Sequence, residues 1–197
     1  MSRHDETEAG EAGAGDTTPA PSIAIRPLAS TEEVRGLDRS LADASPEKHR
    51  RRLEQQQQGR VTYLVAWEGT RPVGHVLVRW DGPTAEPMAS AYPGCPQLED
   101  FFVDAGYRGR RIGLRLLGAA EQQARLRGCR WIGLSVGLTP SFDRARSLYA
   151  RSGYRKAGFA PYYEGWWVRD EQGRRQWWEE ACEYLIKDLV QEPRTTT

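Results

Sequence analysis

Residues 107–113 read Tyr-Arg-Gly-Arg-Arg-Ile-Gly and lie between an apolar stretch, 98–103, and an amphipathic stretch, 111–127. The first amides of a helix have no intrahelical partner and carry partial positive charge. Gly109 and Gly113 let such a backbone approach a bulky anion, and Arg108, Arg110 and Arg111 add positive charge beside it. The turn predicts a phosphate or pyrophosphate site. Taken alone, such a turn is more often only a basic loop, so its surroundings decide.

Working outward from this turn, the sequence predicts alternating strands and helices. Ser30 or Thr31 indicates a helix N-cap, and Pro46 stands at a first helical position. A helix that begins at Arg111 is predicted to end at Gly128. We expect strands at 23–28, 61–67, 73–80, 98–103, 131–136, 154–168 and 181–189, helices after residue 30 and at 46–58, 111–127 and 141–152, and a loop at 81–96.

This order predicts an α/β domain with a mixed sheet and crossover helices on its faces. We expect the domain to span residues 22–190. Residues 1–21 are rich in Gly, Ala, Glu, Asp, Thr and Pro and cannot bury enough surface to offset ordering entropy, so we expect a disordered tail. Residues 191–197 are expected to be frayed.

Composition excludes several classes of function. The formal net charge of +1 gives no electrostatic reason to expect nucleic acid or an anionic membrane as a partner. Three widely spaced cysteines, Cys95, Cys129 and Cys182, indicate neither a disulfide framework nor a metal site. Neither a transmembrane segment nor a signal-peptide core is recognisable, so we expect a cytoplasmic protein.

Two motifs, taken together with their order and separation, indicate which ligand the turn binds. The first runs from Arg108 to Gly113, and the second reads Ala-Arg-Ser-Leu-Tyr-Ala-Arg-Ser-Gly-Tyr over 145–154. Together they resemble the acetyl-CoA-binding core of the GNAT superfamily of N-acetyltransferases, whose patterns are Q/R-x-x-G-x-G/A and A-x-x-L-Y-x-x-x-G-F/Y. The chain departs from the family at Arg111, where the middle glycine is usual, and at Phe142, where asparagine is frequent.

The resemblance implies a GNAT fold: a mixed, mostly antiparallel sheet of about six or seven strands flanked by about four helices. It implies acetyl-CoA as the acetyl donor, bound by a pyrophosphate turn and by the backbone of a strand whose neighbour splays away. Gly133 is a candidate for the irregularity that this splay requires. The cofactor-binding residues would be Phe101, Phe102, Val103, Arg108, Gly109, Arg110, Arg111, Ile112 and Gly113.

Acetyl transfer to an amine needs a base for the ammonium and an acid for the departing thiolate. By resemblance Tyr149 is the acid, near the cofactor sulfur. For the base we choose Glu99, because the strand Leu-Glu-Asp-Phe-Phe-Val resembles that of diamine (spermidine/spermine) acetyltransferases, whose acidic pair faces the polyamine. Strand alternation sends Glu99 and Asp100 to opposite faces, with Phe101 on the side of Glu99, unless a bulge intervenes. His75, inside an apolar strand, is expected to be packed.

The acceptor class stays open at this stage. Aromatic and acidic residues crowd 162–183, a mixture that suits an organic cation, although core packing explains most of the aromatic side chains equally well. The leading interpretation is direct attack, in a ternary complex, by a primary amine of a small cationic molecule: polyamine-like, aminoglycoside-like or derived from an amino acid. The alternatives are a peptide or protein N-terminal acetyltransferase and a non-catalytic acyl-CoA-binding module. Whether the chain is a monomer or a homodimer cannot be read from the sequence.

Overall fold

A computed structural model describes residues 22–42, 46–169 and 172–190. The tails predicted at 1–21 and 191–197 lie outside the described residues. The N-terminal part is formed by β1 Ile23–Pro27, α1 Thr31–Ser40, α2 Pro46–Gln57, β2 Val61–Glu68 and β3 Arg71–Arg79. The Ser30 side chain accepts a hydrogen bond from the Glu33 amide, so the predicted N-cap of the first helix is confirmed.

The middle of the chain holds the strand, turn and helix that contain residues 98–126. Its elements are α3 Met88–Ala91, β4 Gln97–Val103, η1 Ala105–Tyr107, α4 Ile112–Leu126, β5 Trp131–Gly137, η2 Pro140–Phe142 and α5 Asp143–Arg151. The stretch 81–96, predicted as loop, contains the short helix α3. Its Met88 is 1% exposed, and this apolar anchor explains why a segment rich in proline and glycine still makes one helical turn.

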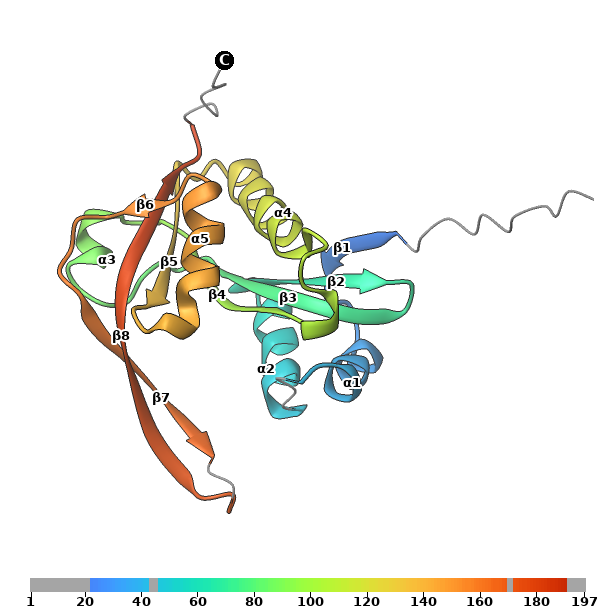
Figure 1. Cartoon of the computed structure of the whole chain (residues 1–197). Helices are drawn as coiled ribbons and strands as arrows, with labels where there is room; N and C mark the ends of the chain where they lie inside the picture. The colour runs from blue at the N-terminus through green and yellow to red at the C-terminus, as the bar shows by residue number, and fades with distance from the viewer. Residues whose placement is uncertain (1–21, 43–45, 170–171, 191–197) are drawn as a thin grey trace, which may run out of the picture.

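The C-terminal part is formed by β6 Arg155–Lys156, β7 Tyr162–Arg169 and β8 Arg175–Asp188. Residues 170 and 171, between β7 and β8, lie outside the described part. The hairpin of β7 and the first half of β8 extends beyond the body of the molecule as an arm (Figure 1). The second half of β8 runs between β5 and β6.

The strands join into one sheet in the order β1-β2-β3-β4-β5-β8-β6, with β7 paired to β8. Every strand pair is antiparallel except β4 with β5, so the predicted mixed, mostly antiparallel sheet is confirmed. The helices α4 and α5 cover one face, and α1 and α2 lie on the other (Figure 1). Separate apolar clusters fill the two interfaces: one centred on Leu116 of α4 and one on Leu37 of α1.

The antiparallel register of β3 and β4 is interrupted by a bulge. It shifts between His75, which lies opposite Phe102, and Leu77, which lies opposite Glu99. Within the shift Asp100 has a positive φ of 51°, a backbone conformation that non-glycine residues seldom adopt. Such an extra residue bends its strand and breaks the alternation of side chains.

Beyond this bend β4 and β5 separate. They pair at only two positions, Gln97 with Gly133 and the next residue of each strand. The splay matches the expectation from sequence, but the irregularity lies at Asp100 and not at Gly133. A Cβ at Gly133 would collide with the Tyr184 hydroxyl, so this glycine makes room for a buried tyrosine.

Candidate active site

A cavity of about 750 Å³ opens where β4 leaves β5, within the size range of small-molecule and cofactor sites. It is bounded by the end of β4, the turn before α4 and one face of α5. Its lining residues are Phe101, Phe102, Val103, Tyr107, Arg108, Gly109, Arg111, Ile112, Gly113, Leu114, Ser141, Arg144, Ala145, Leu148, Tyr149, Arg151 and Ser152. All of the predicted cofactor-binding residues except Arg110 therefore meet in one place.

Arg110 turns away from the cavity. Its guanidinium lies 3.4 Å from the Glu68 carboxylate and stacks over the Tyr107 ring, 4.7 Å from the ring centroid. The Tyr107 hydroxyl donates to the same carboxylate at 2.5 Å, which helps to raise the pKa of this tyrosine. Arg110 and Tyr107 thus fasten the turn to the end of β2, and the charge beside the cavity comes from the neighbouring arginines.

The turn reaches the cavity through unusual backbone angles. Gly109 has φ 83°, and Arg111, the N-cap of α4, adopts the left-handed conformation at φ 59° without a side-chain cap. The first amides of a 15-residue helix therefore lack a side-chain acceptor, as expected of a site that receives an anion. The angle at Arg111 also gives a reason for the family's usual glycine at this position.

Gly113, in the first turn of this helix, lines the cavity. A Cβ there would lie 3.3 Å from Leu148 Cδ2 and 3.5 Å from Phe101 Cε1. The missing side chain keeps the α4 backbone open to a ligand between β4 and α5. The uncapped amides and this bare backbone fit the pyrophosphate and pantetheine of acetyl-CoA.

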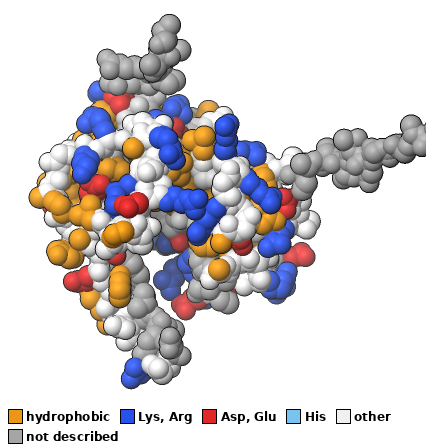
Figure 2. Space-filling model, in the orientation of Figure 1, with side chains coloured by type: hydrophobic (Ala, Val, Ile, Leu, Met, Phe, Trp, Pro, Cys, Tyr) orange, Lys and Arg blue, Asp and Glu red, His pale blue; other side chains and the backbone are white. Residues whose placement is uncertain are grey.

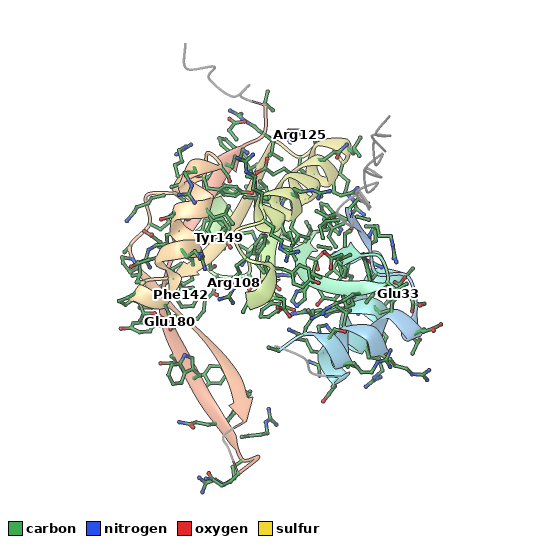
Figure 3. All side chains as sticks on the ribbon, turned by 45° about the vertical axis from the view of Figure 1, so that its right-hand side comes forward. Glu33, Arg108, Arg125, Phe142, Tyr149 and Glu180 are labelled. Carbon is green, nitrogen blue, oxygen red and sulfur yellow. The ribbon has the colours of Figure 1, made fainter. Side chains whose placement is uncertain are left out.

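Tyr149 reaches the cavity from α5 and is 7% exposed (Figure 3). Its ring packs edge-on against Phe101, with centroids 6.1 Å apart. Burial raises the pKa of Tyr149 to about 12, so its hydroxyl keeps its proton throughout the neutral range. The predicted acid therefore lies in the cavity in its protonated form.

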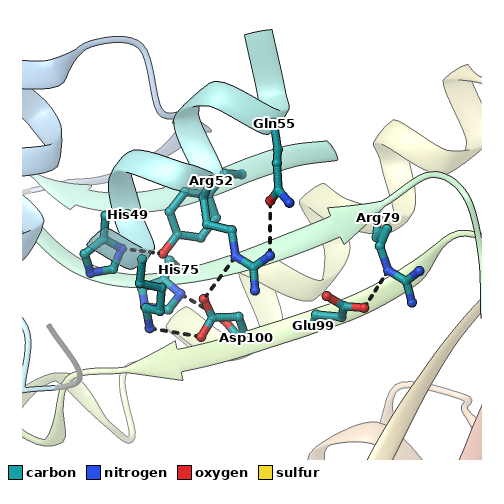
Figure 4. Close-up of polar contacts among 9 residues, drawn as sticks. His49, Arg52, Gln55, His75, Arg79, Glu99 and Asp100 are labelled. Carbon is teal, nitrogen blue, oxygen red and sulfur yellow. Dashed lines mark hydrogen bonds and ion pairs between the residues drawn. The ribbon is translucent and has the colours of Figure 1, made fainter. Parts of the chain in front are cut away.

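The acidic pair of β4 lies on the opposite face of the sheet (Figure 4). Glu99 accepts a hydrogen bond from Arg79 Nε at 2.6 Å. Asp100 forms an ion pair with Lys48 of α2 at 3.1 Å, and its backbone carbonyl lies 2.8 Å from His75 Nδ1. His75 is 0% exposed and stacks on Phe102, as the expectation of a packed histidine requires.

The expected alternation of Glu99 and Asp100 does not hold. Glu99 lies opposite Leu77, whose side chain belongs to the cluster beneath α1 and α2, whereas Phe101 packs into the cluster beneath α4. The bulge turns Asp100 to the side of Glu99, and Phe101, expected to share the side of Glu99, faces the cavity instead. Both carboxylates therefore lie outside the cavity lining, on the α2 face.

Two arginines of the cavity were missed from the sequence. Arg144 and Arg151 of α5 line the cavity, and with Leu148 they follow the i, i+4, i+7 spacing of one helix face. That spacing is visible in the sequence, but it becomes informative only once Tyr149 fixes which face of the helix meets the cavity. Figure 2 shows lysine and arginine side chains across the face that α4 and α5 cover.

Comparisons with known proteins agree with this geometry. A family model described as the acetyltransferase (GNAT) family matches residues 30–154. The search of curated proteins found no match. Within the described part of the chain, none of the helices combines the length and apolar character that crossing a membrane requires.

Solved structures of the same fold resemble the chain over most of its length. A putative GNAT acetyltransferase from Desulfovibrio desulfuricans has a TM-score of 0.59 at 16% identity, over 86% of this chain and 100% of that chain. A ribosomal-protein-alanine N-acetyltransferase from Brucella melitensis has 0.58 at 18%, over 84% and 99%. The PaiA N-acetyltransferase from Thermoplasma acidophilum, in complex with coenzyme A, has 0.57 at 16%, over 85% and 99%.

Proposed function

The chain belongs to the acetyltransferase (GNAT) family and is an acetyl-CoA-dependent N-acetyltransferase, and from this premise we propose that it acetylates a primary amine of a small cationic molecule by direct attack in a ternary complex. The carrying observation is the cavity in which a protonated Tyr149, the separated end of β4 and the uncapped start of α4 meet. On the other face of the same strand lies the acidic pair Glu99 and Asp100. The slot between the separated ends of β4 and β5 thus has one side that suits an anionic donor and another that suits a cationic acceptor.

Acetyl-CoA supplies an acetyl group activated as a thioester. Amides of the turn from Gly109 to Gly113 hold the pyrophosphate, with Arg108, Arg111 and Arg144 providing positive charge around it. The end of β4, at Phe101, Phe102 and Val103, offers backbone groups that β5 does not use, and these pair with the pantetheine arm. This assignment carries the predicted cofactor residues forward, without Arg110.

Tyr149 acts on the leaving group. As the amine nitrogen bonds to the acetyl carbon, the carbon–sulfur bond breaks and negative charge develops on sulfur. The Tyr149 hydroxyl donates a hydrogen bond to that sulfur and can transfer its proton to the departing thiolate. A free thiol has a pKa near 8.5, so the thiolate is already a tolerable leaving group, and Tyr149 accelerates the reaction without being indispensable.

Glu99 remains the proposed base. An alkyl ammonium has a pKa near 10 and must lose a proton before it can attack. Glu99 takes this proton directly or through a water, while Arg79 holds its carboxylate in place. Asp100, engaged by Lys48, attracts the acceptor by charge.

An acceptor panel tests the proposal. The protein and acetyl-CoA are incubated with small diamines and monoamines, an aminoglycoside, amino acids and a peptide with a free N-terminus, and release of free thiol is followed. We expect turnover with small cationic amines. Turnover of the peptide alone would establish an N-terminal acetyltransferase instead. A rise in melting temperature with acetyl-CoA but no turnover of any amine would indicate a binding module.

A further inference from the structure

The arm formed by β7 and β8 carries two carboxylates that face each other. Glu164 and Glu180 are register partners, so their side chains leave the same face of the hairpin. Both lie at the base of the arm, where the hairpin leaves the body, and Figure 3 labels Glu180 at this place. Figure 2 shows the arm standing clear of the rest of the molecule beyond this point.

Glu164 is held from the side of β5. The Ser135 hydroxyl donates to Glu164 Oε1 at 2.6 Å, and the Tyr162 hydroxyl lies 2.5 Å from Ser135 Oγ and 3.3 Å from the same carboxylate oxygen. Ser135 follows immediately after the last residue of β5 that pairs with β4. The network therefore stands on the β5 side of the splayed slot, across from the end of β4.

Glu180 is 9% exposed, and its Oε1 is fully buried without a hydrogen-bond partner among the described residues. It lies directly opposite Glu164 in the register of the hairpin. Burial, as the largest cause, and the two carboxylates raise the pKa of the nearby Cys182 thiol to about 11. A buried polar atom without a partner is costly, and like charges directly opposite each other on a hairpin are destabilising. A positive charge placed between the two carboxylates would offset both costs.

Two other acidic side chains of the sheet, by contrast, have cationic partners. Glu99 pairs with Arg79, and Glu183 pairs with Lys156 at 2.6 Å. Within residues 22–42, 46–169 and 172–190, no lysine or arginine forms an ion pair with Glu164 or Glu180.

We infer that Glu164 and Glu180, with Ser135 and Tyr162, form a subsite that binds a second protonated amine of the acceptor. The inference rests on the proposed function and narrows its substrate class to diamines: one nitrogen is acetylated in the slot and the other stays charged between the two carboxylates. The half-exposed indole of Trp178, whose residue is two positions before Glu180 on the same face, adds an aromatic surface suited to an organic cation.

Tyr184 links the subsite to the side of Glu99 through the register of the sheet. It lies opposite Ser135, and a Cβ at Gly133 would collide with its hydroxyl. Gly133 in turn pairs with Gln97, which accepts a hydrogen bond from Arg79, the partner of Glu99. An acceptor that spans the two sides has a cationic end near Glu164 and a reacting end near the slot.

A matched pair of amines tests the inference. Diaminobutane and butylamine have the same carbon chain, and only the first has a second ammonium group. With the wild type we expect kcat/KM for diaminobutane to exceed that for butylamine by roughly 10- to 100-fold, as for a charge-assisted hydrogen bond. Glu164→Gln and Glu180→Gln should remove this preference through KM and leave butylamine within about twofold of the wild type.

Glu179→Gln is the matched control. Glu179 neighbours Glu180 but points to the other face of the hairpin, where its carboxylate accepts from Trp177 Nε1 at 2.9 Å. This variant should keep the diamine preference. Glu180→Gln should also raise the melting temperature without ligand, because it removes a buried charge that has no partner. If Glu164→Gln fails to fold, Ser135→Ala takes its place as a smaller change, and it should weaken the diamine preference.

Each result is decisive. Equal kcat/KM for the two amines in the wild type, an unchanged preference in both glutamine variants, or equal losses on both amines would overturn the subsite while leaving acetyl transfer intact. Calorimetric titration of diaminobutane into the protein saturated with coenzyme A needs no turnover. Binding that is present in the wild type and lost in Glu180→Gln supports the subsite even if the acetylation assay fails, and its absence overturns it.

Discussion

The two sides of the slot between β4 and β5 are built in different ways. The donor side comes from two compact segments, the stretch 101–114 and the helix α5, and it presents arginines and uncapped amides. The acceptor side comes from α2, β3, β4, β5 and the distant β7–β8 hairpin, and it presents carboxylates. In the function proposed above, local sequence specifies the site for the anionic donor, whereas long-range packing specifies the site for the acceptor amine.

The strand β4 belongs to both sides. Its bulge at Asp100 places Phe101 in the donor cavity and Glu99 on the acceptor face within a few residues. Substitutions on the two sides should therefore have different effects. Donor-side changes should affect acetyl-CoA binding or the departure of the thiolate, and acceptor-side changes should affect binding or deprotonation of the amine.

The largest effect is expected at Gly113. Gly113→Leu places side-chain atoms where a Cβ already lies 3.3 Å from Leu148, and it fills the approach to the α4 backbone. Acetyl-CoA should no longer raise the melting temperature, and turnover should be lost. Gly118→Leu, on the same helix with nothing within 4 Å of its Cβ position, is the control and should bind acetyl-CoA normally. A thermal shift retained in Gly113→Leu would place the cofactor elsewhere.

Much of this donor side was predictable from the sequence. The motif from Arg108 to Gly113 and the position of Tyr149 are local patterns that the fold preserves, because a strand, a turn and a helix fix their own geometry. The side of the turn on which Arg110 lies was not predictable. It depends on Glu68, which is 42 residues away in the sequence.

The acceptor side was predicted less well. The prediction of regular alternation failed at Asp100, because no glycine or proline in the sequence marks the bulge there. The Asp100 carbonyl instead bonds to His75, which is 25 residues away in the sequence. The aromatic and acidic composition of 162–183 suits an organic cation, but core packing explains most of its aromatic side chains equally well, so the composition singles out no residue. Only the register of β7 against β8 brings Glu164 opposite Glu180.

Tyr149→Phe tests the donor side without altering its shape. We expect kcat to fall by about one to three orders of magnitude, the range of general acid catalysis, with little change in acetyl-CoA affinity. Because burial raises the pKa of Tyr149 to about 12, its proton is present at lower pH and lost only above that value. The wild-type rate should therefore not decline between neutral pH and about pH 10 through ionisation of Tyr149. An unchanged kcat in the variant would reduce Tyr149 to a packing role.

The acceptor side is tested by Glu99→Gln against Asp100→Asn. The first should lower kcat about 10- to 100-fold near pH 7 and recover near pH 10, where the amine deprotonates without help. The second should raise KM for cationic acceptors more than it lowers kcat. Steady-state kinetics across this pH range separate the two. Equal losses at every pH would exclude both as the base and favour a chain of water molecules.

A smaller effect is expected from His75, which connects the two sides through the bulge. His75→Leu removes the hydrogen bond to the Asp100 carbonyl, and a buried group left unsatisfied costs about 1–3 kcal/mol of unfolding free energy. Because the bulge orients Phe101 as well as Glu99, KM should rise for both substrates. His75→Asn keeps a donor near the Nδ1 position and should recover part of the loss. Equal stability and KM in both variants and the wild type would show that the bulge forms without His75.

The smallest effect is expected at Arg111, where the family usually has glycine. The left-handed conformation costs an arginine about 1 kcal/mol, and glycine adopts it without that penalty. Arg111→Gly should therefore raise the melting temperature by a few degrees. The same change removes a charge from the cavity but leaves the backbone amide, so KM for acetyl-CoA should rise by no more than about threefold, as expected for one exposed charge. Denaturation and kinetics measured on the same preparation test both halves. A stabilised protein with unaltered KM would show that the backbone amides alone bind acetyl-CoA. A KM raised more than tenfold would show that the Arg111 side chain supplies binding that other family members obtain from the closer backbone of their glycine.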